Sequence, residues 1–304
     1  MGLKELENGG KSLPMFEFKL DKMLTNASIL MIGKRGSGKS VVSQALIEHF
    51  HRIPVVVIIA PTDKMNCFYG KFCSDTFIYY SFSSSILENL MRRQEKMIEK
   101  EKDKKRQGKK VDPSALIVMD DCMSDGTTWV KDDKIKELLF NGRHFKIMYI
   151  LTLQFALGIP PSFRTNFDYI FMLAEDFTTN IEKLHKHYAG MFKDFHSFKE
   201  IFDQVTSNHG SMVIANRGPR SSFQEKVFWY VAPYKDPDNP DTKYEKIGCK
   251  QFRYFHQKNY DKDWRKRNRG FDANMFFTRG KQDKNTAFRV SRYDKDNEGY
   301  IHRK

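Results

Sequence analysis

The chain has 304 residues, of which 40% are hydrophobic, so it can bury the core of one large domain or of a domain with appendages. It contains no run of about 18 or more apolar residues, which excludes a conventional membrane-spanning helix. The formal net charge is +14, and the section from Cys249 to the end holds 16 Lys and Arg against 7 Asp and Glu. A basic surplus of this kind indicates a polyanionic partner, usually nucleic acid, although a solubilising tail would carry the same charge.

Residues 1–27 are predicted to form an N-terminal lead-in with a short strand at 15–18. The polar residues 1–11 lack the apolar segment of a secretory signal, and the four cysteines form no CxxC pair. Both observations favour a reducing, intracellular location.

An apolar run at 29–32 predicts a buried strand, and residues 41–47 predict a helix. The residues between them fit the pattern G-x-x-x-x-G-K-[ST] at every fixed position: Gly33, Lys34, Arg35, Gly36, Ser37, Gly38, Lys39 and Ser40. Backbone amides of such a loop and of the helix that follows bind phosphates, whereas a glycine-rich turn without a ligand does not require these flanks. We therefore predict that residues from Gly33 to Val41 bind a nucleotide, with Lys39 reaching the β- and γ-phosphates and Ser40 binding Mg²⁺.

The remaining elements alternate between strands and helices. Residues 84–110 predict a long helix with an amphipathic first half and a charged second half that projects into solvent. Two late strands at 211–215 and 226–231 look like a hairpin around Gly218-Pro219. Further strands are predicted at 55–60, 76–80, 115–119, 147–152 and 168–173, and helices at 134–140, 178–189 and 197–205. Continuously apolar strands between helices predict an α/β fold with a mostly parallel central sheet flanked by helices.

Two adjacent carboxylates follow the apolar run at 115–119. Asp120 ends that run and Asp121 comes directly after it. In a phosphate-loop fold the first of these residues binds Mg²⁺, and the second is placed to orient and deprotonate the attacking water. Two surface aspartates at a strand end are the alternative interpretation.

Gln154 follows the strand predicted at 147–152. A side-chain amide at this point can contact the γ-phosphate or the attacking water and report its presence. It implies an additional strand between the loop strand and the acidic strand, which distinguishes RecA/FtsK-like P-loop hydrolases from simple nucleotide kinases. A glutamine with a purely structural role is the alternative.

Two arginines are candidates for a finger that completes the site of a neighbouring subunit. Arg143 lies in the run 141–144, and Arg164 lies in a loop between two strands. A finger stabilises the charge that develops in the transition state of phosphoryl transfer. For Arg143, a structural role at a helix C-terminus is an equally good interpretation.

The chain beyond residue 232 is polar, basic and aromatic. We therefore divide it into a lead-in (1–27), a P-loop ATPase core (28–232) and a basic C-terminal segment (233–304). Aromatic residues interleaved with Lys and Arg suit base stacking and phosphate contact on a nucleic acid, while packing of this segment on the core is the alternative.

Five motifs together carry a family resemblance: residues 33–40, 117–122, 140–144, 153–154 and 163–166. Over about residues 25–215 the chain resembles the genome-packaging ATPases of large nucleocytoplasmic DNA viruses, the poxvirus A32-like branch of the FtsK–HerA superfamily. The roles that the resemblance implies fall on Lys39, Ser40, Asp120, Asp121, Gln154 and Arg143. Many superfamily members have Glu where this chain has Asp121, so the general base has a shorter side chain here.

The resemblance further implies ATP and Mg²⁺ as cofactors and a homo-oligomeric ring, expected to be a pentamer or a hexamer. It also implies translocation of double-stranded DNA, a capsid or portal partner, and a place in the viral factory of the host-cell cytoplasm or with the virion. Two other functions stay open from the residues alone: a small-molecule or nucleotide kinase, and an ATP-dependent assembly switch without translocation. DNA-independent phosphoryl transfer would distinguish the first, and ATP-dependent oligomerisation without movement along DNA the second.

Overall fold

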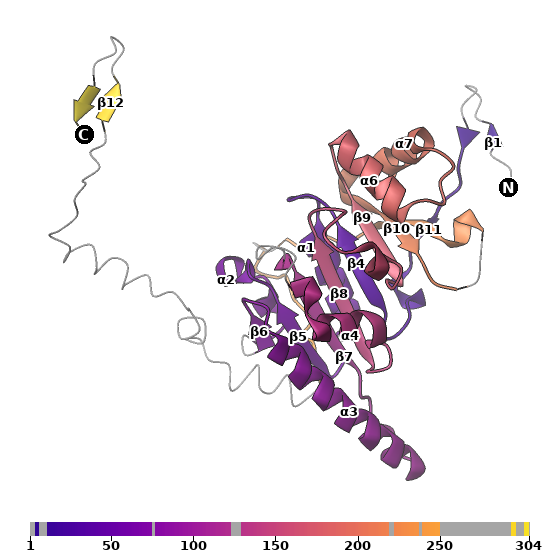
Figure 1. Cartoon of the computed structure of the whole chain (residues 1–304), viewed down its shortest axis with the longest axis vertical. Coiled ribbons are helices and arrows are strands. Elements are labelled where there is room, and N and C mark those ends of the chain that lie inside the picture. Colours follow the sequence, from indigo (N-terminus) through magenta and orange to yellow (C-terminus); the bar gives the residue numbers. More distant parts are fainter. Residues whose placement is uncertain are drawn as a thin grey trace. The chain divides into compact units, whose positions relative to one another are not determined.

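The computed structural model describes residues 4–5, 11–74, 77–122, 129–218, 222–236, 239–249, 293–295 and 301–303. The chain divides into two compact units, residues 1–261 and 262–304. The first unit contains a nine-stranded sheet (Figure 1). Two antiparallel pairs lie outside this sheet: β1 (Lys4–Glu5) with β2 (Lys11–Ser12) in the first unit, and β12 (Tyr293–Lys295) with β13 (Ile301–Arg303) in the second.

The nine-stranded sheet has the order β3-β11-β10-β9-β4-β8-β7-β5-β6. All neighbouring strands run parallel except β10, which is antiparallel to both β9 and β11. The strands are β3 (Phe16–Glu17), β4 (Ser28–Ile32), β5 (Val55–Ile59), β6 (Ile78–Tyr79), β7 (Ala115–Asp120), β8 (Ile147–Leu153), β9 (Tyr169–Leu173), β10 (Gly210–Ala215) and β11 (Val227–Val231). The predicted α/β class with a mostly parallel sheet is confirmed.

The position of β8 confirms the additional strand inferred from Gln154. β8 lies between β4, which leads into the glycine loop, and β7, which ends at Asp120. Its residues are buried throughout, as expected for a strand that is covered on both faces. The register pairs Asp120 with Thr152, so the acidic end of β7 and the polar end of β8 meet at one edge of the sheet.

The helices are α1 (Lys39–His49), α2 (Asp63–Asn66), α3 (Ser84–Arg106), α4 (Asp133–Asn141), α5 (Pro161–Arg164), α6 (Thr178–Tyr188) and α7 (Phe195–Val205). Short 3₁₀ turns lie at Leu20–Lys22, Tyr69–Lys71, Trp129–Lys131, Ser207–His209 and Phe223–Glu225. The buried residues of α3 all lie in its first half, and its charged second half projects away from the sheet, as predicted (Figure 1). The two four-residue helices α2 and α5 were not predicted, because single helical turns have no periodicity to detect.

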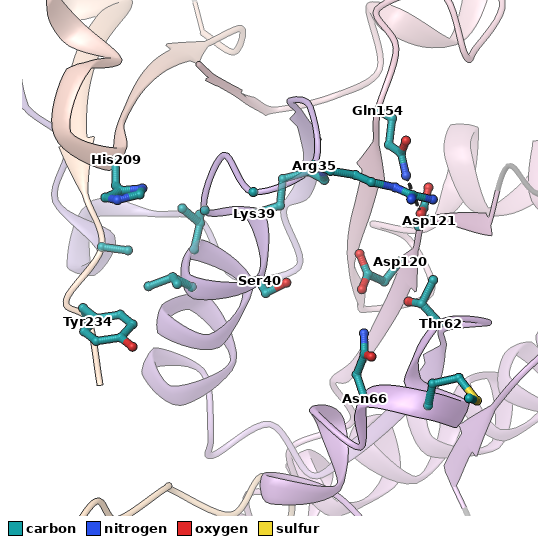
Figure 2. Close-up of a pocket in the computed structure, with 16 residues that line it drawn as sticks. Arg35, Lys39, Ser40, Thr62, Asn66, Asp120, Asp121, Gln154, His209 and Tyr234 are labelled. Atoms are coloured by element: carbon teal, nitrogen blue, oxygen red, sulfur yellow. Dashed lines mark hydrogen bonds between the residues drawn. The ribbon is translucent and has the colours of Figure 1, made fainter. Parts of the chain in front are cut away.

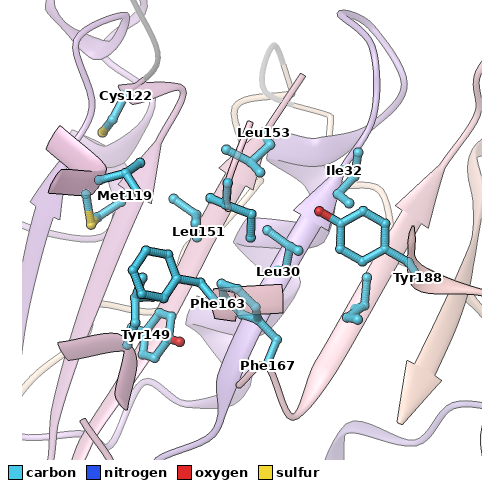
Figure 3. Packing of buried hydrophobic residues seen from close by; sticks show 14 of the residues in the cluster. Leu30, Ile32, Met119, Cys122, Tyr149, Leu151, Leu153, Phe163, Phe167 and Tyr188 are labelled. Atoms are coloured by element: carbon cyan, nitrogen blue, oxygen red, sulfur yellow. The ribbon is translucent and has the colours of Figure 1, made fainter. Parts of the chain in front are cut away.

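Two hydrophobic clusters cover the two faces of the sheet. On one face, buried residues of α1 such as Leu46 pack with strand residues such as Ile29 and Val56. On the other face, residues of α3, α4, α6 and α7 pack with Leu30, Leu151 and their neighbours. Figure 3 shows part of this cluster, including Leu30, Leu151 and Tyr188 of α6. The sheet is thus a rigid layer between helices, and it fixes where the carboxyl ends of β4, β7 and β8 meet.

Two details differ from the sequence predictions or extend them. The strand predicted at 76–80 is reduced to β6, with residues 75–76 outside the described part. β10 and β11 do form an antiparallel hairpin, but its connection runs from 216 to 226 and includes the turn Phe223–Glu225.

The segment beyond residue 232 packs on the core as far as the structure describes it. Ile247 is buried, and the Tyr244 and Phe72 rings lie 5.4 Å apart in an edge-to-face contact. The predicted boundary at 232/233 therefore falls inside the first compact unit, and most of the basic segment beyond Cys249 lies outside the described residues. Within the described ranges, no helix combines the length and the apolar character needed to cross a membrane.

Candidate nucleotide-binding site

The glycine loop joins the end of β4 to the start of α1 in a tight curve. A Cβ atom at Gly33 would lie 2.6 Å from Ser37 Oγ and 2.8 Å from Leu173 Cβ, so only glycine fits there. Gly38 caps α1 with a φ of 101°, a conformation that side chains disfavour. The loop therefore presents the first turn of α1, with its unpaired amides and positive dipole end, to an anion.

Lys39 folds back over this loop. Its ammonium donates hydrogen bonds to the carbonyls of Gly33 and Lys34, the latter at 2.9 Å. Burial lowers the pKa of Lys39, an effect that the nearby Asp121 and Asp120 oppose. A phosphate that enters the loop would replace two neutral carbonyl acceptors by charged oxygens, which are stronger partners for a partly desolvated ammonium.

A cavity of about 1070 Å³ opens beside the loop at the carboxyl edge of the sheet (Figure 2). Its volume suits a ligand larger than a bare phosphate. Three groups of residues line it: the loop and the start of α1, the residues after β5, β7 and β8, and residues near β10 and β11. In chain order they are Arg35, Gly36, Gly38, Lys39, Ser40, Val41, Val42, Thr62, Met65, Asn66, Asp120, Asp121, Gln154, His209, Ala232 and Tyr234.

Asp120 faces this cavity from the end of β7, across from Ser40 on α1 (Figure 2). Thr152 Oγ1 donates a 2.5 Å hydrogen bond to Asp120 Oδ1 and so fixes the carboxyl group. Burial raises the pKa of Asp120, and the hydrogen bond from Thr152 offsets part of that effect. A hydroxyl and a partly desolvated carboxylate are hard oxygen donors of the kind that Mg²⁺ prefers, so the two residues fit the predicted metal.

Asp121 is held by the neighbouring strand. Its backbone N–H donates to Thr152 Oγ1 at 3.0 Å, and Gln154 Nε2 donates to its Oδ2 at 2.5 Å. The residue has a φ of 51°, a left-handed conformation that few residues other than glycine, asparagine and aspartate adopt. This turn brings the second carboxylate and the Gln154 amide together at the wall of the cavity.

With this geometry in view, the comparisons with known proteins identify the family. Residues 15–227 match the family described as Poxvirus A32 protein. The chain belongs to this family. It is 44% identical over 250 residues to an uncharacterized protein of Acanthamoeba polyphaga mimivirus, which covers 82% of this chain and 85% of that protein. It is 31% identical to an uncharacterized protein of Invertebrate iridescent virus 6, with 79% of this chain and 88% of the relative covered.

Solved structures of a viral protein also resemble this chain, at low sequence identity. The genome packaging NTPase B204 from Sulfolobus turreted icosahedral virus 2, in complex with sulfate, superposes with a TM-score of 0.47 and 14% identity, over 70% of this chain and 100% of that chain. The family resemblance drawn from the sequence motifs is confirmed by the match of residues 15–227 to the Poxvirus A32 protein family.

In this A32-family chain, several residues of the site carry no sequence motif. Thr152 was predicted only as part of an apolar strand, yet its hydroxyl donates to the Asp120 carboxylate and accepts a hydrogen bond from the backbone N–H of Asp121. Tyr69 is fully buried beside Asp120, and burial together with the Asp120 charge raises the pKa of its hydroxyl well above the usual value. The only sequence signal for a role of Thr152 is that it is a polar residue in the otherwise apolar strand β8.

Arg143 follows α4 and precedes β8, so it lies near the amino-terminal end of β8. The cavity of the same subunit lies at the carboxyl ends of the strands. Its guanidinium is 3.7 Å from Asp168 Oδ1, and Arg217 contacts the same oxygen at 3.7 Å. The Asp168 side chain is only 5% exposed and accepts hydrogen bonds from the backbone and the hydroxyl of Ser28. Any catalytic role for Arg143 must therefore act on a different subunit.

Arg164 is buried within its own subunit. Its guanidinium donates two hydrogen bonds to the Ile159 carbonyl, at 3.1 and 2.9 Å, and lies over the Tyr188 ring. These contacts fasten the loop after β8 to α6. To act as a finger, Arg164 would have to leave both partners.

The raised pKa of Asp120 gives a test of how its burial affects stability. The folded state holds the proton of the Asp120 carboxyl group more tightly than the unfolded chain does. The free energy of unfolding therefore falls as the pH rises through the folded-state pKa of Asp120, and it stays lowered at higher pH. We expect the metal-free Asp120→Asn variant to melt at a higher temperature than the wild type at pH 8. The gain should shrink as the pH is lowered towards 4, as measured by thermal denaturation in the presence of EDTA.

The matched control is Asp133→Asn at the exposed start of α4. A hydrogen bond from Lys136 lowers the pKa of Asp133, so this change should bring no gain at pH 8. A melting temperature of Asp120→Asn at or below that of the wild type at pH 8 would contradict the cost assigned to ionising the buried Asp120 carboxyl group.

Proposed function

We propose that the chain is an ATP-hydrolysing, double-stranded-DNA translocase that packages a viral genome into its capsid. The observation that carries the proposal is the convergence of Lys39, Asp120 and the Asp121–Gln154 pair on one cavity. That convergence depends on the additional strand β8, in a chain of the Poxvirus A32 protein family.

The residues divide the work of phosphoryl transfer. The loop amides and Lys39 hold the β- and γ-phosphates, and Lys39 neutralises charge that builds up on them. Mg²⁺, when bound through Ser40 and Asp120, supplies further charge neutralisation on the phosphate oxygens. Asp121 orients the attacking water and accepts its proton, because its carboxylate lies at the cavity wall beside the phosphate loop.

Gln154 couples the nucleotide state to the rest of the molecule. Its amide donates to Asp121 and lines the same cavity, so it can exchange that partner for the γ-phosphate or the attacking water. It follows β8 directly and begins the loop that Arg164 fastens to α6. A change of partner at Gln154 would therefore shift the segment that follows it.

The active form would be a homo-oligomeric ring in which an arginine of one subunit completes the site of the next. Arg143 supports this arrangement better than Arg164, because its guanidinium is half exposed whereas Arg164 is 8% exposed. The buried Asp168 would keep Arg143 oriented towards the neighbouring subunit. Removing a trans-acting arginine costs about 10³-fold or more in turnover where such fingers operate.

The partner to be moved is double-stranded DNA. The net charge of +14 favours a polyanion, and family membership favours a viral genome with a capsid or portal component as the docking partner. Such a function belongs in the viral factory of the host-cell cytoplasm or on the virion.

The deciding experiment is an ATPase assay of the full chain with and without linear double-stranded DNA. We expect DNA to raise ATP turnover several-fold at about 50 mM salt and much less at about 200 mM, since phosphate contacts weaken steeply with salt. Turnover that ignores DNA across the whole salt series would contradict translocation. Transfer of the phosphoryl group to a nucleoside, without DNA stimulation, would favour a kinase instead.

A further inference from the structure

One side of the cavity takes no part in the phosphate chemistry described above. His209, Ala232 and Tyr234 line it, and His209 and Tyr234 lie on the other side of α1 from Asp120 (Figure 2). They come from the turn before β10 and the segment after β11, far from any motif in the sequence. This side of the wall is mainly aromatic and apolar, whereas the opposite side carries the carboxylates.

The phosphate chemistry fixes which end of a nucleotide reaches this wall. Asp120, Asp121 and Gln154 gather where hydrolysis takes place, so the terminal phosphate lies there. The other phosphates bind the start of α1, and the rest of the nucleotide continues across that helix. The base therefore arrives on the side of His209 and Tyr234.

Tyr234 is an exposed aromatic side chain held by a fixed backbone. It is 71% exposed and lines the cavity, so its ring is accessible to a ligand there. The next residue, Lys235, pairs with Glu48 of α1 at 2.7 Å and donates to the Lys243 carbonyl at 3.0 Å. The ring is thus presented beside α1 by an anchored segment.

His209 stands on a strained turn. Asn208 and His209 both have left-handed backbones, with φ of 49° and 61°, between the end of α7 and Gly210. Two consecutive left-handed residues other than glycine strain the backbone, and such strain gathers at ligand clamps. A Cβ at Gly210 would lie 2.1 Å from the Val205 carbonyl, so the chain can make this turn only with glycine there.

We propose that Tyr234 and His209 bind the nucleobase of ATP by stacking, and that they form the base subsite of this cavity. The inference rests on the proposed ATPase function and adds to it the residues that recognise the base. Stacking on aromatic rings accepts any base, because every base has a π-face.

The test compares a ligand with a base and one without. Binding of ATP and of inorganic tripolyphosphate to the full chain is measured by calorimetry for wild type, Tyr234→Ala, His209→Ala and Tyr234→Phe. We expect Tyr234→Ala to weaken ATP binding about 5- to 150-fold, the range that stacking on one aromatic ring provides, while tripolyphosphate binding stays unchanged. His209→Ala should act in the same direction, and Tyr234→Phe should retain ATP affinity.

The control is Phe16→Ala, since Phe16 is also an exposed aromatic residue (59%) but lies on the edge strand β3 and does not line the cavity. It should bind both ligands as the wild type does. Unchanged ATP affinity in Tyr234→Ala and His209→Ala, or an equal loss for both ligands, would overturn the base subsite while leaving the phosphate site intact. A wild-type protein that binds neither ligand would overturn the nucleotide site itself.

Discussion

Replacing Lys39 by alanine should abolish nucleotide-dependent activity of this chain. Lys39 is the cation that the loop places over its own carbonyls, and it lines the cavity with Asp120 and Asp121. Without it, the charge that develops on the phosphates in the transition state has lost its protein counter-charge. We expect ATP turnover to fall by at least about 100-fold, the loss that follows removal of one strong electrostatic group from an active site.

The same variant should fold well, because burial lowers the pKa of Lys39 and shows that its charge is costly there. The melting temperature without nucleotide should therefore match or exceed that of the wild type, while the rise in melting temperature on adding ATP disappears. Lys136→Ala on the exposed face of α4 is the control and should hydrolyse ATP as the wild type does. Hydrolysis at the wild-type rate in Lys39→Ala would mean that the glycine loop is not the phosphate site.

The predictable part of this fold follows from the nature of a buried parallel sheet. Strands such as β5 and β7 are covered on both faces, so their sequences are continuous apolar runs, and the run of β7 ends abruptly at Asp120. Because parallel strands end at one edge, Asp120 and Gln154 could be expected to meet near the glycine loop. In the structure Asp120 and Gln154 line the same cavity, and Gln154 donates a hydrogen bond to the Asp121 carboxylate.

What the sequence could not predict depends on contacts across strands and turns. Thr152 contacts both the Asp120 carboxylate and the Asp121 backbone N–H only because β8 lies beside β7 in one register, and no local pattern encodes that register. Tyr234 and His209 approach α1 from two separate segments, and stacking on a base requires only an aromatic ring, not a fixed spacing.

The arginines show a different limit of the sequence. The place of Arg164 between two predicted strands suggests a finger where subunits meet, yet its guanidinium bonds to the Ile159 carbonyl and lies over the Tyr188 ring. Arg143 was equally compatible with a helix-ending role, and it does follow α4 while also contacting the buried Asp168. A role between subunits depends on where a second copy of the chain binds, and a single sequence does not predict that position.

Replacing Asp121 by asparagine should separate nucleotide binding from hydrolysis. Asparagine keeps the size of the side chain and tolerates the left-handed backbone at this position, and it can still accept the Gln154 hydrogen bond. It cannot accept a proton from water, so turnover should fall about 10²- to 10⁴-fold, the range that general-base catalysis contributes. ATP should still bind, because Lys39 and the loop amides are untouched, and this is measured by calorimetry beside the ATPase assay.

Two further variants decide whether Asp121 acts through its proton chemistry or through its position. Asp121→Glu restores a base with one more methylene group, so it should recover part of the turnover that Asp121→Asn loses. Gln154→Ala removes the partner that aims the carboxylate, so it should slow hydrolysis less than Asp121→Asn does. If Asp121→Asn and the wild type hydrolyse ATP equally fast, the base must be another group. Asp121 would then only position Gln154 through their hydrogen bond. The proposed coupling of the nucleotide state to the segment after Gln154 would depend on that hydrogen bond alone.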